Sequence, residues 1–281
     1  MKLLVLWTLM SFMMMNTHHS SYATEGTATL NTTADKHIED VYYAICTDGN
    51  SMPSFNVFEK AYRGYLNLQA VGKLSQNKQI LTICDLSLSA NINRMWIIDL
   101  AQNKVLLHTL VAHGQGSGEE YAVKFSNKMN SHQTSLGFYV TGDTYTGEHG
   151  RSLYLHGMDR GFNNMAYERA IVVHGADYVS KDFICNNERL GRSWGCPAVP
   201  AKLSNKVIDH IKDGTCLFIY YPQEKYLKSS VWINKPISTI PVNIAGKFEI
   251  RQKPQRAIVY EYSPKMLAIM KEVSKIKLPL L

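Results

Sequence analysis

The sequence predicts a mainly β protein with helical additions at both ends. Short apolar runs rich in β-favouring residues recur between residues 95 and 221, and turn residues separate them. Helical spacing of apolar residues is strongest before residue 70 and after residue 200. With 281 residues, 45% of them hydrophobic, the chain is long enough for one large core or two small ones.

The N-terminus resembles a secretory signal. Lys2 supplies a positive charge, and the apolar stretch over 3–15 is shorter than the roughly 18–20 residues that span a bilayer. Ser21 and Ala23 place small side chains at the two positions that a signal peptidase recognises. We expect residues 1–23 to be a cleaved signal peptide, with an uncleaved anchor as the alternative. No later segment is apolar enough to span a membrane, so no stable span is expected after processing.

Residues 24–90 are expected to form a flexible and then helical segment that packs onto the main domain. Residues 24–40 are rich in Thr, Asn and Ala and show no periodicity, which indicates a flexible start to the mature protein. A helix is predicted from Pro53, because large apolar residues recur three and four positions apart. These residues are Phe55, Phe58, Tyr62, Tyr65 and Leu66.

The main domain is expected over 91–222. Apolar runs at 95–100 and 105–111 flank a short polar segment, which indicates a β-hairpin. A helix is predicted from Pro200, with Gly214 as its stop. The remaining predicted strands and turns are strands at 137–141, 152–156, 170–174 and 216–221, and turns at 142–143 and 146–150.

Residues 223–281 are expected to form a C-terminal extension. A short strand is predicted over 238–244. A terminal helix is predicted from Ser263, which has the side chain of an N-cap, and Pro264 follows at the first helical position.

Composition argues against several classes of function. The 30 Lys and Arg residues outnumber the 23 Asp and Glu residues by seven, but no run of five basic residues occurs, so no nucleic-acid partner is expected. The glycine-rich loop at 113–118 lacks the Lys-Ser/Thr pair of a phosphate-binding loop. No cysteine spacing matches a zinc site of the C-x-x-C type. We therefore expect no metal and no cofactor.

Five cysteines are an odd number for an exported chain. If Cys196 is assigned to chemistry, Cys46, Cys84, Cys185 and Cys216 are left, and four cysteines allow three pairings. Disulfides and free buried thiols are both compatible with the sequence.

Two short motifs carry the chemical information. The segment over 170–175, Ala-Ile-Val-Val-His-Gly, places His174 at the end of an apolar strand. The segment over 192–200, Arg-Ser-Trp-Gly-Cys-Pro-Ala-Val-Pro, places Cys196 in a turn of small residues. A thiol attacks a carbonyl as the thiolate and needs a base nearby. We therefore expect Cys196 to be a nucleophile and His174 its base.

The backbone around the cysteine suggests how the reaction is assisted. The N–H groups of Gly195 and Cys196 are candidates for an oxyanion hole. The helix predicted from Pro200 would favour the thiolate through its dipole. The base needs an orienting acceptor, for which the carbonyl of Gly175 and the side chain of Asp177 are candidates.

The His-Gly pair and the Ser-x-Gly-Cys turn resemble the motifs of the L,D-transpeptidases of bacterial cell walls. The resemblance covers roughly residues 90–222 and implies a β-sandwich-like catalytic domain. It also implies that the cysteine is the nucleophile, that the histidine is its base, and that the carbonyl after the histidine orients the ring. The matching residues are His174, Gly175, Ser193, Gly195 and Cys196.

Two positions depart from the commoner family pattern. Trp194 stands where that pattern has His, and it is expected either to stack on the substrate or simply to pack. Ala198 stands where the family has an Arg or Asn, and that Arg is thought to help hold the substrate. Arg192 and Arg151 are the candidates to compensate. The motif Gly-Cys-Pro-Ala is similar to that of a divergent branch.

The resemblance implies that peptidoglycan stem peptides are the substrate. Cys196 would form a thioester with release of D-Ala, and an amine of a second stem would then complete a 3→3 cross-link. With water as acceptor the protein would be an L,D-carboxypeptidase. Carbapenems acylate many relatives, so inhibition is expected, as is a location in the periplasm or cell envelope of a bacterium.

Three other functional interpretations fit the sequence less well. A papain-like peptidase has its Cys before its His, and a caspase-like one carries Gln-Ala-Cys, which is absent here. A metalloenzyme that uses His174 and Cys196 lacks a third ligand at a recognisable spacing. A non-catalytic wall-binding protein on the same scaffold is disfavoured by the intact His, Ser, Gly and Cys.

Overall fold

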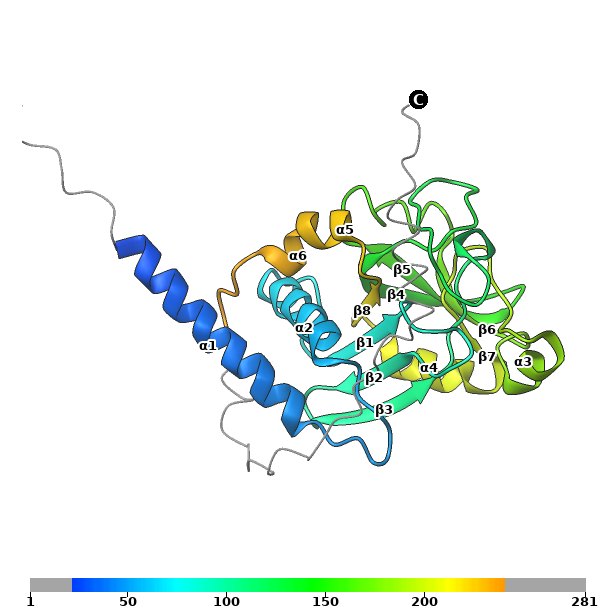
Figure 1. Cartoon of the computed structure of the whole chain (residues 1–281), viewed down its shortest axis with the longest axis horizontal. Coiled ribbons are helices and arrows are strands. Elements are labelled where there is room, and N and C mark those ends of the chain that lie inside the picture. Colours follow the sequence, from blue (N-terminus) through cyan, green and yellow to red (C-terminus); the bar gives the residue numbers. More distant parts are fainter. Residues whose placement is uncertain (1–21, 241–281) are drawn as a thin grey trace, which may run out of the picture.

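One eight-stranded sheet organises the computed structural model, which describes residues 22–240 (Figure 1). The strand order is β3-β2-β1-β8-β4-β5-β6-β7. The strands are β1 (Ile80–Asp85), β2 (Met95–Asp99), β3 (Lys104–Thr109), β4 (Gly137–Gly147), β5 (Gly150–Gly157), β6 (Val172–Ala176), β7 (Ala198–Pro200) and β8 (Cys216–Tyr220). The prediction of a mainly β protein with hairpins is confirmed, since β2–β3 and β4–β5 are antiparallel hairpins.

Two parallel pairs join segments that are far apart in the chain. β1 lies between β2 and β8 and pairs in parallel with β8, so that Leu81 lies opposite Cys216. β6 and β7 are also parallel, with His174 opposite Ala198. The sequence analysis did not predict β1, and the expected domain boundary between residues 90 and 91 falls between β1 and β2 of this one sheet.

Two local predictions within the sheet are wrong. The turn expected at 142–143 lies inside β4, which continues to Gly147 and absorbs the irregularity as a register shift between Thr141 and Thr144. The strand expected from Ala170 begins at Val172, because Ala170 has φ +54° and ends the preceding turn. The hairpin turn between β4 and β5 is where the sequence predicts it.

Helix α2 (Phe55–Ala70) is confirmed. Its N-cap is Ser54, whose side chain accepts a hydrogen bond from the N–H of Val57. The predicted apolar stripe is largely buried against the sheet, and α2 contacts β1 and β8. Gly64 lies so close to the ring of Phe138 that a Cβ there would come within 2.0 Å of it.

The expectation of a flexible segment over 24–40 is wrong, because helix α1 (Tyr22–Ala44) includes these residues. Ile38 and Val41 of α1 are fully buried, and α1 packs on α2. His37 Nε2 lies 3.2 Å from the hydroxyl of Tyr62 on α2. The first half of α1 is rich in Thr and Asn, and the buried apolar residues at helical spacing lie in its second half. Residues 1–21 lie outside the described range.

The first part of the expected C-terminal extension packs on the sheet and α2. The sequence analysis missed helices α5 (Glu224–Ser229) and α6 (Val231–Asn234). Helix α6 lies beside α2, and α5 contacts α6 (Figure 1). The side-chain amide of Asn67 donates to the carbonyls of Trp232 and Lys235, each at 2.9 Å. Residues 238–240 form no strand, and the rest of the strand predicted over 238–244 and the helix from Ser263 lie outside the described residues.

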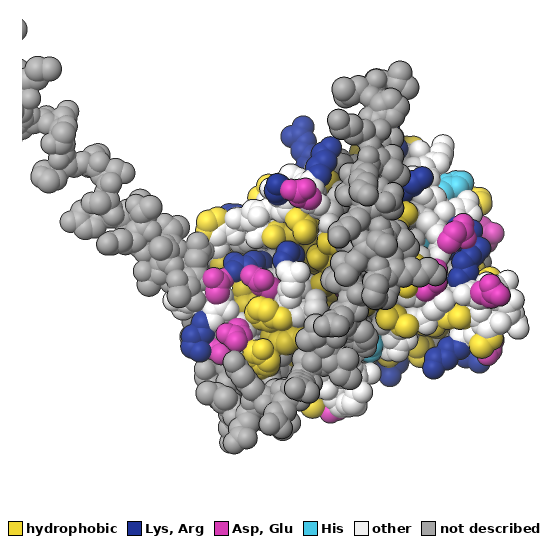
Figure 2. Space-filling model, viewed as in Figure 1, with side chains coloured by type: hydrophobic (Ala, Val, Ile, Leu, Met, Phe, Trp, Pro, Cys, Tyr) yellow, Lys and Arg dark blue, Asp and Glu magenta, His cyan; other side chains and the backbone are white. Residues whose placement is uncertain are grey.

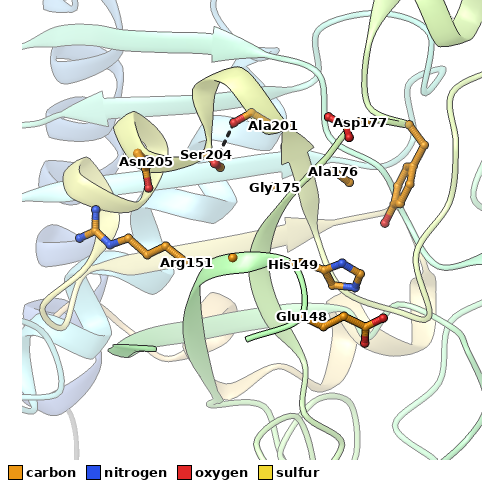
Figure 3. Close-up of a pocket in the computed structure, with 11 residues that line it drawn as sticks. Glu148, His149, Arg151, Gly175, Ala176, Asp177, Ala201, Ser204 and Asn205 are labelled. Carbon is orange, nitrogen blue, oxygen red and sulfur yellow. Dashed lines mark hydrogen bonds between the residues drawn. The ribbon is translucent and has the colours of Figure 1, made fainter. Parts of the chain in front are cut away.

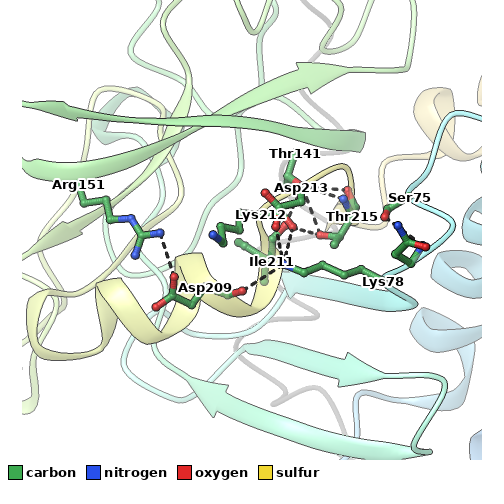
Figure 4. Close-up of polar contacts among 10 residues, drawn as sticks. Ser75, Lys78, Thr141, Arg151, Asp209, Ile211, Lys212, Asp213 and Thr215 are labelled. Atoms are coloured by element: carbon green, nitrogen blue, oxygen red, sulfur yellow. Dashed lines mark hydrogen bonds and ion pairs between the residues drawn. The ribbon is translucent and has the colours of Figure 1, made fainter.

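The helix predicted from Pro200 begins later than expected. Pro200 ends β7, a short 3-10 turn η2 (Ala201–Leu203) follows, and α4 runs over Ser204–Ile211. Cys196 therefore precedes a strand and not a helix N-terminus, and the expected dipole assistance is wrong. The C-terminal end of α4 is held to the sheet by the hydroxyl of Thr141, which donates to the Ile211 carbonyl at 2.7 Å (Figure 4). The remaining helical elements are η1 (Gln115–Ser117) and α3 (Lys181–Asn187).

Basic and acidic side chains are interspersed on the face shown in Figure 2, and no large basic patch is visible there. Within the described residues, no helix is both long and apolar enough to cross a membrane.

Candidate active site

Ser193 fixes the turn that carries Cys196. Its hydroxyl donates to the carbonyl of Cys196 at 2.6 Å and accepts from the N–H of Gly195 at 3.0 Å. Gly195 has φ +124°, and a Cβ there would lie 2.9 Å from the carbonyl oxygen of Gln133, so only glycine fits. Because the N–H of Gly195 is already engaged, it is not free as an oxyanion donor. The N–H of Cys196 makes no hydrogen bond within the described residues.

The thiol of Cys196 lies against the strand that carries His174. The N–H of Val172 points at Sγ from 3.5 Å, and Sγ lies 3.7 Å from the Ala170 carbonyl. Burial raises the pKa of the Cys196 thiol, while the Val172 N–H and the guanidinium of Arg169 act in the opposite direction. The resting cysteine is therefore a neutral thiol. Among the described residues, no hydrogen bond joins it to His174.

Arg169 is a cation near the thiol that the sequence analysis missed. Its guanidinium donates to the carbonyls of Ser126 and Gln133 at 2.8 Å each and to the hydroxyl of Ser135 at 2.5 Å. These bonds fix a positive charge in a half-buried position where it favours the thiolate of Cys196. In the sequence, the one feature that could have indicated a role for Arg169 is its position just before β6, the strand that carries His174.

His174 is oriented by a backbone carbonyl. Its Nδ1 lies 3.0 Å from the carbonyl oxygen of Gly175, and since a carbonyl only accepts, Nδ1 carries the proton and Nε2 is left as the basic nitrogen. Asp177, the other candidate, does not make this contact. Burial lowers the pKa of His174, the Gly175 carbonyl opposes that shift, and the charge of His149 adds to it. The imidazole is therefore neutral at neutral pH.

His149 is a second imidazole beside the candidate base. It lies in the turn between β4 and β5, and its ring stacks on that of His174 with centroids 4.4 Å apart and planes 19° from parallel. The sequence analysis treated this segment only as a turn. The contact depends on the pairing of β5 with β6, which brings the hairpin to His174.

The structure shows the surroundings of Trp194 and of the two arginines expected to compensate for Ala198. Trp194 is 72% exposed and stacks on His132, with ring centroids 5.0 Å apart and planes 8° from parallel, so it is not a core residue. Arg192 is paired with Glu119 at 2.6 Å, and Arg151 is paired with Asp209 at 2.9 Å (Figure 4). Neither arginine is an unpaired cation beside Cys196.

A cavity of about 560 Å³ adjoins the candidate base (Figure 3). It is lined in part by Gly175, whose carbonyl orients His174, and by His149, whose ring stacks on it. Its charged wall residues include Glu148, Arg151 and Asp177. None of the residues of the cysteine turn lines it.

The structure also bears on metals and cysteines. Within residues 22–240, no three His, Cys, Asp or Glu side chains are grouped so that they could hold a metal ion. All five cysteines are free thiols here, with Cys84 and Cys216 buried and Cys185 exposed. Of the other four cysteines, Cys84 and Cys216 match the expected free buried thiols, whereas Cys46 and Cys185 are free but not buried.

Comparison with known proteins places these features in a family. Residues 50–220 match the family described as L,D-transpeptidase catalytic domain. Similar solved structures include an L,D-transpeptidase from Mycobacterium smegmatis (12% identity, TM-score 0.32), the L,D-transpeptidase LdtMt1 with imipenem (12%, 0.31) and the Ldtfm-avibactam carbamoyl enzyme (15%, 0.28). The alignments cover 51%, 51% and 53% of this chain and 59%, 59% and 51% of those chains. No curated protein matches significantly. Because the matched segment is more than half of the chain and includes both motifs, the chain belongs to the L,D-transpeptidase catalytic domain family.

Proposed function

We propose that the protein is an exported cysteine acyltransferase that acts on peptidoglycan stem peptides and forms 3→3 cross-links with release of D-Ala. The observation that carries this proposal is the pairing of β6 with β7. It brings the thiol of Cys196 next to the strand of His174, whose tautomer is fixed by the Gly175 carbonyl. We place the protein in the periplasm or cell envelope of a bacterium, after removal of residues 1–23.

The first step forms a thioester. Sγ of Cys196 attacks the carbonyl carbon of the bond between the third stem residue and the terminal D-Ala, and the thiol proton passes to Nε2 of His174. The oxyanion of the tetrahedral intermediate faces the free N–H of Cys196. When the C–N bond breaks, His174 returns the proton to the amine of the departing D-Ala.

Proton transfer has to accompany the attack, because the resting pair is neutral. Burial holds the pKa of Cys196 above its ordinary value and that of His174 below its own. Arg169 stabilises the thiolate as it forms.

The second step transfers the acyl group to an amine. The nitrogen of a neighbouring stem attacks the thioester carbonyl, one of its protons passes through His174, and the thiolate leaves and is protonated. If water attacks instead, the product is a tripeptide stem and the protein is an L,D-carboxypeptidase. Carbapenems offer the same thiol a strained carbonyl, so we expect them to acylate Cys196.

The test is to incubate the purified protein with a disaccharide-tetrapeptide and to separate the products by liquid chromatography. We expect release of D-Ala together with cross-linked dimer. Cys196→Ala should abolish both, since it removes the thiol that forms the thioester. Cys185→Ala is the matched control, because that thiol is exposed on α3, and it should leave turnover unchanged. Turnover that persists in Cys196→Ala contradicts the proposal.

A further inference from the structure

One peptide plane of the cysteine turn, the plane between Gly195 and Cys196, is held by a residue from outside the turn. The hydroxyl of Thr134 donates to the carbonyl of Gly195 at 3.2 Å and accepts from the N–H of Gly114 at 2.9 Å. Thr134 is 1% exposed, so both hydrogen bonds are shielded from water. Ser193 bonds the Gly195 N–H and the Cys196 carbonyl, which belong to the two neighbouring planes. Thr134 therefore fixes the one plane of the turn that Ser193 does not bond.

This peptide plane carries the N–H that the proposed reaction uses. In a trans peptide, the carbonyl and the N–H of one plane point in opposite directions, and no peptide bond of the described residues is cis. Because the Gly195 carbonyl points at Thr134, the Cys196 N–H points away from it, and that N–H has no acceptor within residues 22–240. A hydrogen bond to the carbonyl also polarises the amide, which makes its N–H a stronger donor.

The glycine at position 195 makes such a restraint necessary. Gly195 has φ +124° and no Cβ, so the peptide plane that follows it can rotate with little steric hindrance. A flip of that plane would exchange the directions of its carbonyl and its N–H. The turn nevertheless requires glycine, because a Cβ would lie 2.9 Å from the carbonyl oxygen of Gln133. The hydroxyl of the next residue, Thr134, opposes the rotation that this glycine permits.

The glycine-rich loop at 113–118 holds Thr134 in place relative to the turn. Gly114 pairs with Ser193 in an isolated parallel bridge. A Cβ on Gly114 would lie 2.8 Å from Cα of Gly195, so the two backbones are in direct contact. The N–H that bonds the Thr134 hydroxyl therefore belongs to a segment that is itself paired with the cysteine turn.

We propose that Thr134 is a positioning residue that holds the Cys196 N–H toward the oxyanion formed during acylation. This inference rests on the proposed function. As Sγ adds to the carbonyl carbon of the donor, the electron pair of the C=O bond moves to the oxygen. The Cys196 N–H stabilises the charge that develops there and keeps its own proton. The Thr134 hydroxyl acts through the peptide plane, and the thiol proton still passes to His174.

The test separates oxyanion stabilisation from the general integrity of the turn. Thr134→Val removes the hydroxyl and keeps the shape of the side chain, whereas Thr134→Ser keeps the hydroxyl. With disaccharide-tetrapeptide as substrate, we expect kcat for D-Ala release to fall by roughly tenfold in Thr134→Val with KM unchanged, because the N–H is misdirected but not removed. Thr134→Ser should keep the kcat of the unmodified protein.

The second readout is the rate at which iodoacetamide alkylates Cys196. Alkylation is a displacement at a saturated carbon, so it needs the thiolate but forms no oxyanion. We therefore expect Thr134→Val to be alkylated as fast as the unmodified protein. A turn that is merely distorted would alter the surroundings of the thiol and change this rate together with turnover.

Thr141→Val is the matched control. Thr141 is also buried, and its hydroxyl likewise donates to a backbone carbonyl, that of Ile211 at 2.7 Å, and accepts from a backbone N–H, that of Thr215 at 2.8 Å (Figure 4). These bonds hold the end of α4, so we expect this variant to lose comparable stability and to keep its kcat. Circular dichroism checks folding, and Thr134→Cys, which has a weaker donor, replaces Thr134→Val if that variant does not fold.

The outcomes distinguish this inference from the function on which it rests. The positioning role is overturned, and the proposed function stands, if folded Thr134→Val keeps its kcat, raises KM instead, or loses alkylation as steeply as turnover. It is also overturned if Thr134→Ser or Thr141→Val is slowed as much as Thr134→Val. If the unmodified protein releases no D-Ala, the proposed function fails and the positioning role fails with it.

Discussion

At the scale of single residues, the cysteine turn depends on Ser193 as much as on Cys196. One hydroxyl accepts from the N–H of Gly195 and donates to the carbonyl of Cys196, so it closes the turn around the proposed nucleophile. The resemblance identified Ser193 as a site residue, but the sequence did not indicate that it would occupy the Gly195 N–H. That contact depends on turn geometry that no spacing encodes.

The stacked imidazoles lead to a prediction about pH. The charge of His149 lowers the pKa of His174, in addition to the larger effect of burial. His149→Phe keeps a ring on His174 but removes that charge, so the pKa of His174 should rise towards its ordinary value. Since the proposed mechanism requires His174 in its neutral form, the acid limb of the kcat/KM profile should then move to higher pH.

A second stacked histidine provides the control for that profile. His132 stacks on Trp194 and is not among the groups that shift the pKa of His174, so His132→Phe should leave the acid limb in place. The electrostatic account fails if both variants shift the limb equally or if His149→Phe moves it to lower pH.

At the scale of elements, α6 is held to α2 by a buried amide. Asn67→Ala leaves the carbonyls of Trp232 and Lys235 without their donor and should lower the free energy of unfolding by about 2 kcal/mol. Asn56→Ala makes the same change on the exposed part of α2 and should cost far less. Chemical denaturation of both variants measures the difference, and equal losses would show that the buried amide does not anchor α6.

Most predicted elements are found, and the misses have physical causes. Strands β2 and β3 and helix α2 have strong periodicity and are nearly where the sequence places them. α1 was missed because its stripe, with Ile38 and Val41, follows a polar first half. β1 was missed although its antiparallel neighbour β2 follows closely in the chain. Its other neighbour, β8, follows more than a hundred residues later, and no local pattern indicates that parallel pairing.

The residues of the candidate site also fall into two groups, those that the sequence indicated and those that it did not. Cys196, His174 and Gly175 were recognisable because their chemistry lies in contiguous motifs. Arg169, His149 and the cavity were not, because each depends on the packing of loops and hairpins from different parts of the chain.

At the scale of the whole molecule, the sheet does not divide at the boundary that the sequence suggests. A fragment over 91–281 lacks β1, which pairs with β2 on one side and β8 on the other, and also lacks α2. We expect that fragment to show no cooperative thermal transition, whereas a fragment over 24–281 should unfold in one. A cooperative transition in the shorter fragment would mean that β2 and β8 can close the sheet without β1.

The central claim is that Cys196 carries the acyl group between donor and acceptor. The most direct measurement is intact-protein mass spectrometry after mixing with disaccharide-tetrapeptide, followed by digestion to locate any adduct. The account predicts an added mass equal to the donor without its D-Ala, on the peptide that contains Cys196, and no adduct in Cys196→Ala. An adduct on another residue, or D-Ala release that continues in Cys196→Ala, would contradict it.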